Sequence, residues 1–214
     1  LRPGRLDEAI ALLAQAPAVP LAGGTDFYPA RAAHMPDETV LDLTGIAALR
    51  GISVDSGAVR IGALATWTEL LETGLPPLFD GLKAAARQVG GRQVQNAGTI
   101  AGNLCNASPA ADSVPALVAA NAMAVVAGSK GKREVPVAEI PTAPGKTSLA
   151  KDEIVEAIVL PAKPANTGDA YLRFIPRTEM DIAVVGVGVC LTLDASGTCT
   201  AARVALGAVG PRGI

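Results

Sequence analysis

The stretch with the clearest capacity for chemistry is residues 96–115, which reads N-A-G-T-I-A-G-N-L-C-N-A-S-P-A-A-D-S-V-P. It combines small residues, glycines, hydroxyls and asparagines, and Asp112 directly precedes an apolar helical run. A backbone with so few bulky side chains can approach a ligand closely, and its N–H groups can bind an anion such as a pyrophosphate. A second bare turn, L-A-G-G-T-D at residues 21–26, lies far upstream. We therefore expect the two segments to hold one dinucleotide.

Each segment taken alone also fits a purely structural role. A Gly-Gly pair after a strand is often an ordinary tight turn, and Asp112 can act only as a helix cap. Residues 96–115 contain no G-x-G-x-x-G dinucleotide fingerprint. The G-K-T at residues 145–147 is not a P-loop either, because Ile140 stands where the first glycine is required. Neither segment by itself decides between a binding site and a turn.

Other chemically capable side chains are sparse. The single histidine, His34, has no cysteine or carboxylate at metal-ligand spacing, so we expect it at the surface. Cys190 lies in an apolar strand pattern and is expected in the core, whereas Cys105, inside the bare segment, is a candidate for a position near a cofactor.

Arg173 and Arg177 lie four residues apart in an expected strand, which places them on one face, and Asp181 follows four residues later. The pattern fits a cation beside a bound cofactor. It fits equally well an exposed face that carries an Arg–Asp pair.

Composition excludes several classes of function. The chain has 214 residues, 50% of them hydrophobic, and a net charge of −2 without a lysine or arginine cluster, which argues against nucleic-acid binding. No apolar run is long enough to span a bilayer. Three cysteines without a spacing pattern favour a reducing, cytoplasmic compartment. One histidine and 3% aromatic residues disfavour a self-contained hydrolase, which needs more acid–base groups.

The bare segments need regular elements to position them. Apolar periodicity and capping residues predict helices at 6–14, 66–73, 79–89 and 112–120, with a helical turn at 29–33. Strands are expected at 19–22, 40–43, 52–54, 59–61, 123–127, 134–137, 154–160, 170–177, 183–193 and 200–208, and loops at 96–111 and 142–151. The mixture indicates an α+β fold with two lobes, residues 1–44 and 45–214.

Four segments in this order resemble one family: P-L-A-G-G-T-D-F at 20–27, T-I-A-G-N-L-C-N-A-S-P-A-A-D at 99–112, K-T-S-L-A-K-D-E-I-V at 146–155 and Y-L-R-F-I-P-R-T-E-M-D-I-A at 171–183. They resemble the FAD-binding (medium) subunit of molybdenum hydroxylases, such as carbon monoxide dehydrogenase and bacterial xanthine dehydrogenase. The resemblance covers essentially the whole chain. It implies a two-lobed FAD-binding fold of the vanillyl-alcohol-oxidase (PCMH) type.

The resemblance also assigns roles to individual residues. Residues 21–26 and 99–103 would hold the FAD pyrophosphate and neighbouring groups. Asp112 would hydrogen-bond on the nucleotide side of the cofactor, and Val155 would contact the flavin half. Arg173 takes the place of a family lysine near the isoalloxazine. The expected FAD-binding residues are Leu21, Ala22, Gly23, Gly24, Thr25, Asp26, Gly98, Thr99, Ile100, Ala101, Gly102, Asn103, Asp112, Val155 and Arg173. Added bulk at Gly23 or Gly102 should therefore expel FAD while sparing the fold.

The chain departs from the family pattern at three points. Ala101 replaces the second glycine of T-I-G-G-N, and Arg173 keeps the charge of lysine but changes its shape. We also expect the family's small C-terminal domain to be absent, with residues 204–210 at the junction. The chain opens without a methionine, and we expect a fragment or one processed part of a longer protein.

The function that the resemblance implies is electron transfer, with no catalytic acid–base residue and no metal on this chain. Electrons would pass from [2Fe–2S] clusters on a small partner subunit through FAD to an external acceptor, such as NAD, while a large molybdopterin subunit hydroxylates the substrate. Two alternatives stay open: a stand-alone FAD oxidase of the same superfamily, and a non-catalytic fragment that serves in assembly.

Overall fold

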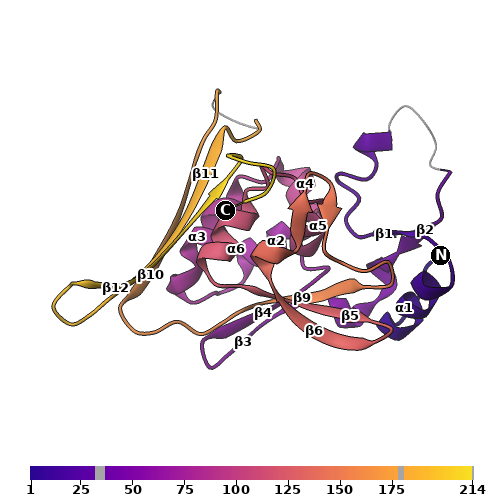
Figure 1. Cartoon of the computed structure of the whole chain (residues 1–214), viewed down its shortest axis with the longest axis horizontal. Coiled ribbons are helices and arrows are strands. Elements are labelled where there is room, and N and C mark those ends of the chain that lie inside the picture. The colour runs from indigo at the N-terminus through magenta and orange to yellow at the C-terminus, as the bar shows by residue number, and fades with distance from the viewer. Residues whose placement is uncertain (32–36, 178–180, 214) are drawn as a thin grey trace.

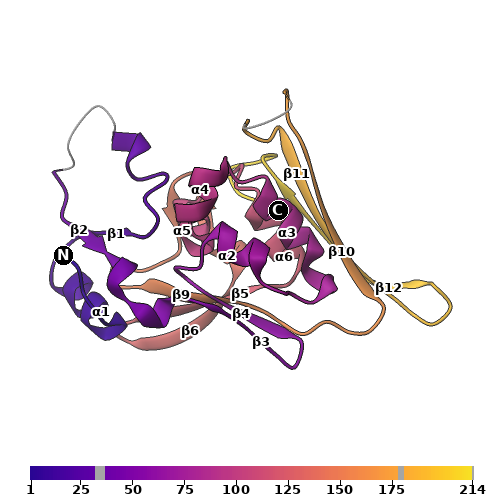
Figure 2. The same cartoon turned by 180° about the vertical axis from the view of Figure 1, so that it is seen from behind.

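The computed structural model describes residues 1–31, 37–177 and 181–213. Two antiparallel sheets flank a group of short helices, and a small unit at the N-terminus lies at one end (Figures 1 and 2). This mixture of helices and antiparallel sheets confirms the expected α+β class. No helix in the described ranges is long and apolar enough to cross a membrane.

The N-terminal unit contains helix α1 (Leu6–Gln15) and a two-stranded parallel sheet of β1 (Val19–Leu21) and β2 (Val40–Asp42). Ala9 and Leu13 are the buried residues of α1. A short 3-10 helix, η1 (Pro29–Arg31), lies between the strands and confirms the described part of the expected helical turn. Because β1 ends at Leu21, the first bare turn begins at the C-terminal end of this strand.

The larger sheet has five antiparallel strands in the order β3-β4-β9-β5-β6. The strands are β3 (Ile52–Asp55), β4 (Ala58–Gly62), β5 (Met123–Gly128), β6 (Gly131–Pro136) and β9 (Ile154–Leu160). Both expected hairpins, β3-β4 and β5-β6, are therefore confirmed. Strand β9 is the central strand, and most of its residues are buried.

The second sheet has three antiparallel strands in chain order. They are β10 (Thr167–Phe174), β11 (Val185–Leu193) and β12 (Cys199–Gly207). Its inner face packs on two of the helices, and a Cβ at Gly188 would lie 2.3 Å from the backbone oxygen of Pro115. The absence of a side chain at Gly188 lets the helix backbone lie directly on the sheet.

Five α-helices lie between the two sheets (Figure 1). They are α2 (Trp67–Glu72), α3 (Asp80–Arg87), α4 (Arg92–Ala97), α5 (Ile100–Asn106) and α6 (Ser113–Ala119). The capping box expected at the start of α2 is present, with Thr66 accepting from the Glu69 amide and the Glu69 side chain accepting from the Thr66 amide. The largest fully buried side chains include Trp67 and Phe79.

Several expected elements differ in the structure. Residues 96–111 are not a continuous loop, because α4 and α5 occupy much of the surrounding stretch. Glycine at position 102 weakens a helix by about 1 kcal/mol relative to alanine, but α5 buries Ile100 and Leu104, and burial outweighs propensity. The expected loop at 142–151 contains the short strands β7 (Pro141–Ala143) and β8 (Lys146–Thr147).

The structure differs from the sequence expectation at two charged residues, Arg177 and Asp112. Strand β10 ends at Phe174, so Arg177 is not on the same strand face as Arg173. Asp112 stands before α6 as expected, but its side chain makes no capping hydrogen bond, and its own backbone is already helical. His34 lies outside the described residues.

The contact between Gly188 and α6 gives a direct test of the packing. We expect Gly188→Ala to lower the free energy of unfolding by about 1–3 kcal/mol, because the new methyl group must push helix and sheet apart. The matched control is Gly168→Ala on the neighbouring strand, where no atom lies within 4 Å of the new Cβ. Chemical denaturation measures both. Equal stabilities of the two variants would contradict this account of the helix–sheet contact.

Candidate functional site

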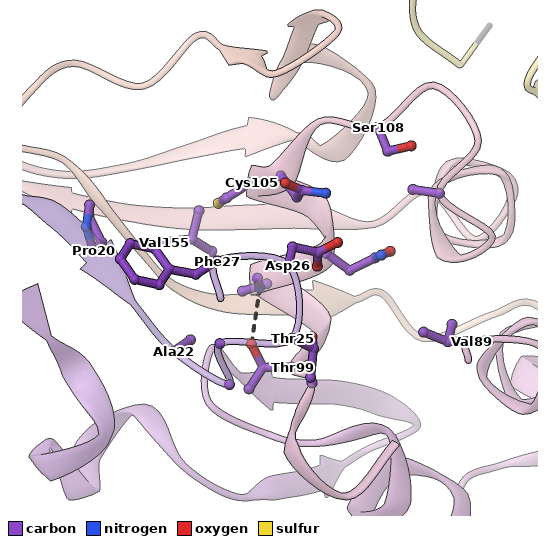
Figure 3. A pocket seen from close by; sticks show the side chains of 18 of the residues that line it. Pro20, Ala22, Thr25, Asp26, Phe27, Val89, Thr99, Cys105, Ser108 and Val155 are labelled. Carbon is purple, nitrogen blue, oxygen red and sulfur yellow. Dashed lines mark hydrogen bonds between the residues drawn. The ribbon is translucent and has the colours of Figure 1, made fainter. Parts of the chain in front are cut away.

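The two bare segments meet at one cavity of about 1080 Å³. Its walls come from the turn after β1, the first turn of α5, strand β9 and residues at and beyond the end of β10. The predicted site residues that line it are Leu21, Ala22, Gly23, Gly24, Thr25, Asp26, Gly98, Thr99, Ala101, Gly102, Asn103, Asp112, Val155 and Arg173. Ala22, Thr25, Asp26, Thr99 and Val155 surround the same space in Figure 3. Segments distant in the sequence are thus brought together as predicted.

Ile100 is the one predicted site residue that the structure places elsewhere. Its side chain is only 1% exposed and belongs to the hydrophobic core. Its amide donates to the carbonyl of Ala65 at 3.2 Å, which ties the start of α5 to the segment before α2. Ile100 therefore anchors the helix rather than lining the cavity, because its side chain packs into the hydrophobic core.

Gly23 fits directly against the second segment. A Cβ at Gly23 would lie 1.9 Å from the carbonyl oxygen of Ala97 and 2.9 Å from the Cα of Gly98. Real Cβ contacts are essentially never this short, so any side chain at Gly23 would separate the two segments. The sequence expectation that bulk at Gly23 spares the fold does not agree with this geometry.

The first turn offers a row of backbone donors. Between β1 and Tyr28, within the described part of the chain, the amides of residues 22–27 find no protein acceptor. Gly24 has a φ of +73°, a conformation that suits glycine and that side-chain-bearing residues rarely adopt. Successive amides in such a turn form a concave surface that binds anions. The turn is therefore suited to a phosphate-bearing ligand.

Thr99 shapes the second segment. Its hydroxyl accepts from the Gly102 amide at 3.1 Å and caps α5, and the Thr99 side chain is buried (Figure 3). Asn103 is fixed one turn later, because its Oδ1 accepts from the hydroxyl of Ser113 at 2.6 Å. These bonds hold the first turn of α5 and the Asn103 side chain in place beside the cavity.

A charged group closes another wall of the cavity. Arg173 donates from Nη1 to Oδ2 of Asp112 at 3.0 Å, and Tyr171 donates from its hydroxyl to Oδ1 of Asp112 at 2.6 Å. Burial raises the pKa of Asp112 above its ordinary value, although the Tyr171 hydrogen bond and the Arg173 charge act in the opposite direction. Burial, and after it the bond to Asp112, raises the pKa of Tyr171.

Arg177 and Asp181 form an ion pair, which was one of the two interpretations of this sequence pattern. Arg177 Nε lies 3.0 Å from Asp181 Oδ2, and the Arg177 side chain is 71% exposed. Both residues also line the cavity. Arg177 is thus exposed to solvent and Asp181 is half-buried, whereas the Arg173 side chain is buried.

Some lining residues were not predicted. Phe27 and Arg31 line the cavity, and the Arg31 guanidinium carbon lies 3.9 Å from the centre of the Phe27 ring. Phe27 directly follows the bare turn, which is the only signal that could have indicated it. Ser108 also lines the cavity, and its position inside the bare segment at 96–115 was the signal that could have indicated it.

The cysteines differ in their surroundings. Cys190 is buried in β11, as expected. Cys105 lines the cavity from α5 (Figure 3), and burial raises the pKa of its thiol to about 12. Among the described residues, no group of three or more His, Cys, Asp or Glu side chains could hold a metal ion.

Comparison with known proteins places the chain among flavin-binding domains. A family model described as the FAD binding domain in molybdopterin dehydrogenase matches residues 1–163. The xanthine dehydrogenase FAD-binding subunit of Escherichia coli O157:H7 is 36% identical, over 98% of this chain and 73% of the relative. The carbon monoxide dehydrogenase medium chain of Hydrogenophaga pseudoflava is 32% identical, over 98% of this chain and 74% of the relative.

Solved structures of related proteins show the same similarity. A carbon monoxide dehydrogenase structure from Hydrogenophaga pseudoflava gives a TM-score of 0.91 at 32% identity and covers 100% of this chain and 75% of that one. Reconstituted CO dehydrogenase from Oligotropha carboxidovorans gives 0.91 at 29% identity, with the same coverage. These similarities support the expected PCMH-type fold.

A second family model, the CO dehydrogenase flavoprotein C-terminal domain, matches residues 170–214. These residues include β11, β12 and most of β10, which the sequence analysis assigned to the second lobe. The match does not agree with the expectation that this domain is absent from the chain. The lobe boundary at residue 44 stays a prediction.

The half-buried position of Cys105 and the raised pKa of its thiol predict its reactivity. At pH 8 we expect Cys105 to react with iodoacetamide at least about a hundredfold more slowly than exposed Cys199, because the reactive thiolate of Cys105 is scarce. Peptide mapping by mass spectrometry measures both rates in one sample. Equal labelling of Cys105 and Cys199 in the folded protein would show that its surroundings on α5 do not raise the pKa of the Cys105 thiol.

Proposed function

The chain belongs to the family of the FAD binding domain in molybdopterin dehydrogenase, and from this premise we propose that it is the FAD-binding electron-transfer subunit of a molybdenum-containing hydroxylase or dehydrogenase. One observation carries the proposal. The two small-residue segments, far apart in the sequence, line a single cavity, and one of them presents unpartnered amides in the described ranges.

The residues present fit FAD. The cavity volume of about 1080 Å³ slightly exceeds the range of about 300–1,000 Å³ that is usual for small-molecule sites, which suits a large ligand such as a dinucleotide. The amides of residues 22–27 match the oxygens of a pyrophosphate. Val155 contributes apolar lining, and the buried Arg173 guanidinium contributes a fixed positive charge.

The chain's own residues would bind and orient the cofactor rather than transfer protons. Residues 22–27, Ala101 and Gly102 would hold the diphosphate region, and Val155 would contact the flavin half. When bound, FAD supplies the redox chemistry that the side chains lack, exchanging single electrons with an iron–sulfur cluster and pairs of electrons with an acceptor. The positive charge of Arg173 would favour negative charge on nearby ligand atoms.

The proposed partners follow from the relatives, several of which are named as medium chains or FAD-binding subunits. We propose a [2Fe–2S] small subunit and a large molybdopterin subunit as partners, and NAD as an external acceptor. Three free cysteines in the described chain support a reducing, cytoplasmic compartment.

Purification of the full chain with its neighbours tests the assignment. We expect one FAD per chain in the absorbance spectrum, released on denaturation, and co-purification of iron–sulfur and molybdopterin subunits. Flavin that stays attached after denaturation, without partner subunits, would instead favour the stand-alone oxidase. A folded chain that binds no flavin would favour the assembly fragment and would contradict the proposal.

Gly102 gives the sharpest single-residue test. A Cβ at Gly102 would lie 2.7 Å from the Thr99 hydroxyl, and the next side-chain atom of another segment, Ala22 Cβ, is 4.0 Å away. Added bulk therefore disturbs the Thr99 cap and enters the space between the two segments. We expect Gly102→Val to lower FAD affinity at least about a hundredfold, measured by flavin fluorescence titration.

The control for this prediction is Gly74→Val, at an exposed position where no atom lies within 4 Å of the new Cβ. Circular dichroism must show both variants folded. Full FAD affinity in a folded Gly102→Val protein would overturn the assigned binding role of α5.

A further inference from the structure

The Arg173 guanidinium has an unusual environment for a charged group. Its side chain is only 6% exposed, and Nη1 donates to Asp112 Oδ2 and, at 3.3 Å, to the carbonyl oxygen of Asp181. Its Nε is buried and has no hydrogen-bond partner among the described residues. Arg173 also lines the cavity, so its guanidinium charge lies beside the space that a ligand would occupy.

Asp112 is held from a second direction. Its Oδ1 accepts from the Tyr171 hydroxyl at 2.6 Å, while Oδ2 accepts from Arg173. Tyr171 and Arg173 stand two residues apart on β10, so both side chains point to the same face of the sheet. One carboxylate at the start of α6 therefore bridges two side chains of β10.

The neighbouring strand leaves room for this arrangement. A Cβ at Gly186 of β11 would lie 2.8 Å from the Tyr171 hydroxyl oxygen. Tyr171 is 5% exposed, and its raised pKa keeps the hydroxyl protonated as a donor. Close packing against Gly186 and the hydrogen bond to Asp112 therefore hold the phenol in one position.

We propose that Tyr171 is a positioning residue that acts through Asp112 to fix the Arg173 guanidinium, so that its positive charge is held beside the bound cofactor. This inference rests on the proposed function, because the cofactor is FAD. Tyr171 itself does not line the cavity. Loss of its hydroxyl leaves Asp112 with one partner, and Arg173 then loses its defined position.

The test compares Tyr171→Phe with Thr167→Val in the purified full chain. Thr167 lies on the same face of β10, is buried, and hydrogen-bonds to Thr192 at 2.9 Å, so its loss removes a comparable bond away from the cavity. We expect Tyr171→Phe to weaken FAD binding about tenfold and to make the flavin midpoint potential more negative. Thr167→Val should change neither quantity, and equal effects of the two variants would overturn the inference.

A double-mutant cycle separates positioning from a structural role. In an Arg173→Gln background, Tyr171→Phe should cause no further loss of FAD affinity, because the group that it positions is gone. An undiminished tenfold loss in that background would overturn the proposal. If Tyr171→Phe does not fold, Gly186→Ala, whose new methyl group displaces the Tyr171 hydroxyl, replaces it in the same cycle with the same expectation.

FAD binding by the wild-type chain separates failure of the proposed function from failure of the positioning role of Tyr171. Wild-type protein that binds no FAD would overturn the proposed function and this inference with it. Wild-type protein that binds FAD, together with a Tyr171→Phe variant of unchanged affinity and potential, would overturn the positioning role alone.

Discussion

The structure depends on a backbone contact between two turns that carry almost no side chains. Gly23 lies so close to Ala97 and Gly98 that a single methyl group would not fit between them. This contact brings the N-terminal unit against the helices and leaves the cavity beside it. Residues 22–27 can then present their amides to a ligand instead of to other parts of the protein.

The rest of the fold holds the second turn in place. Hydrogen bonds from Trp67 to Gly98 and from Ile100 to Ala65 attach it to the segment around the start of α2. On the opposite side, the close approach of Gly188 to Pro115 seats α6 on the three-stranded sheet. This packing brings Asp112 next to the side chains of β10, where Asp112 binds Arg173 and holds its positive charge at the cavity. Small residues therefore serve packing in one place and ligand access in another.

The sequence predicts the parts of this structure that depend on local chemistry. The capping box at Thr66, both hairpins of the five-stranded sheet and the turn after β1 follow from residue types at short spacing. The bare second segment was expected as a loop, because its glycines and asparagines disfavour helix. Residues 100–106 nevertheless form helix α5, because Ile100 and Leu104 are buried. Local propensity cannot reveal which side chains tertiary packing will bury. The roles of Asp112 and Tyr171 were hidden for the same reason, since their bond joins residues 59 positions apart.

Hydrogen–deuterium exchange of the wild-type chain, titrated with FAD, tests the central claim that both turns form one binding site. The account predicts that amides in residues 22–27 and in residues 97–103 become protected together, with the same FAD dependence and saturation at one FAD per chain. Protection confined to one of the two segments, or appearing at different FAD concentrations in each, would contradict it.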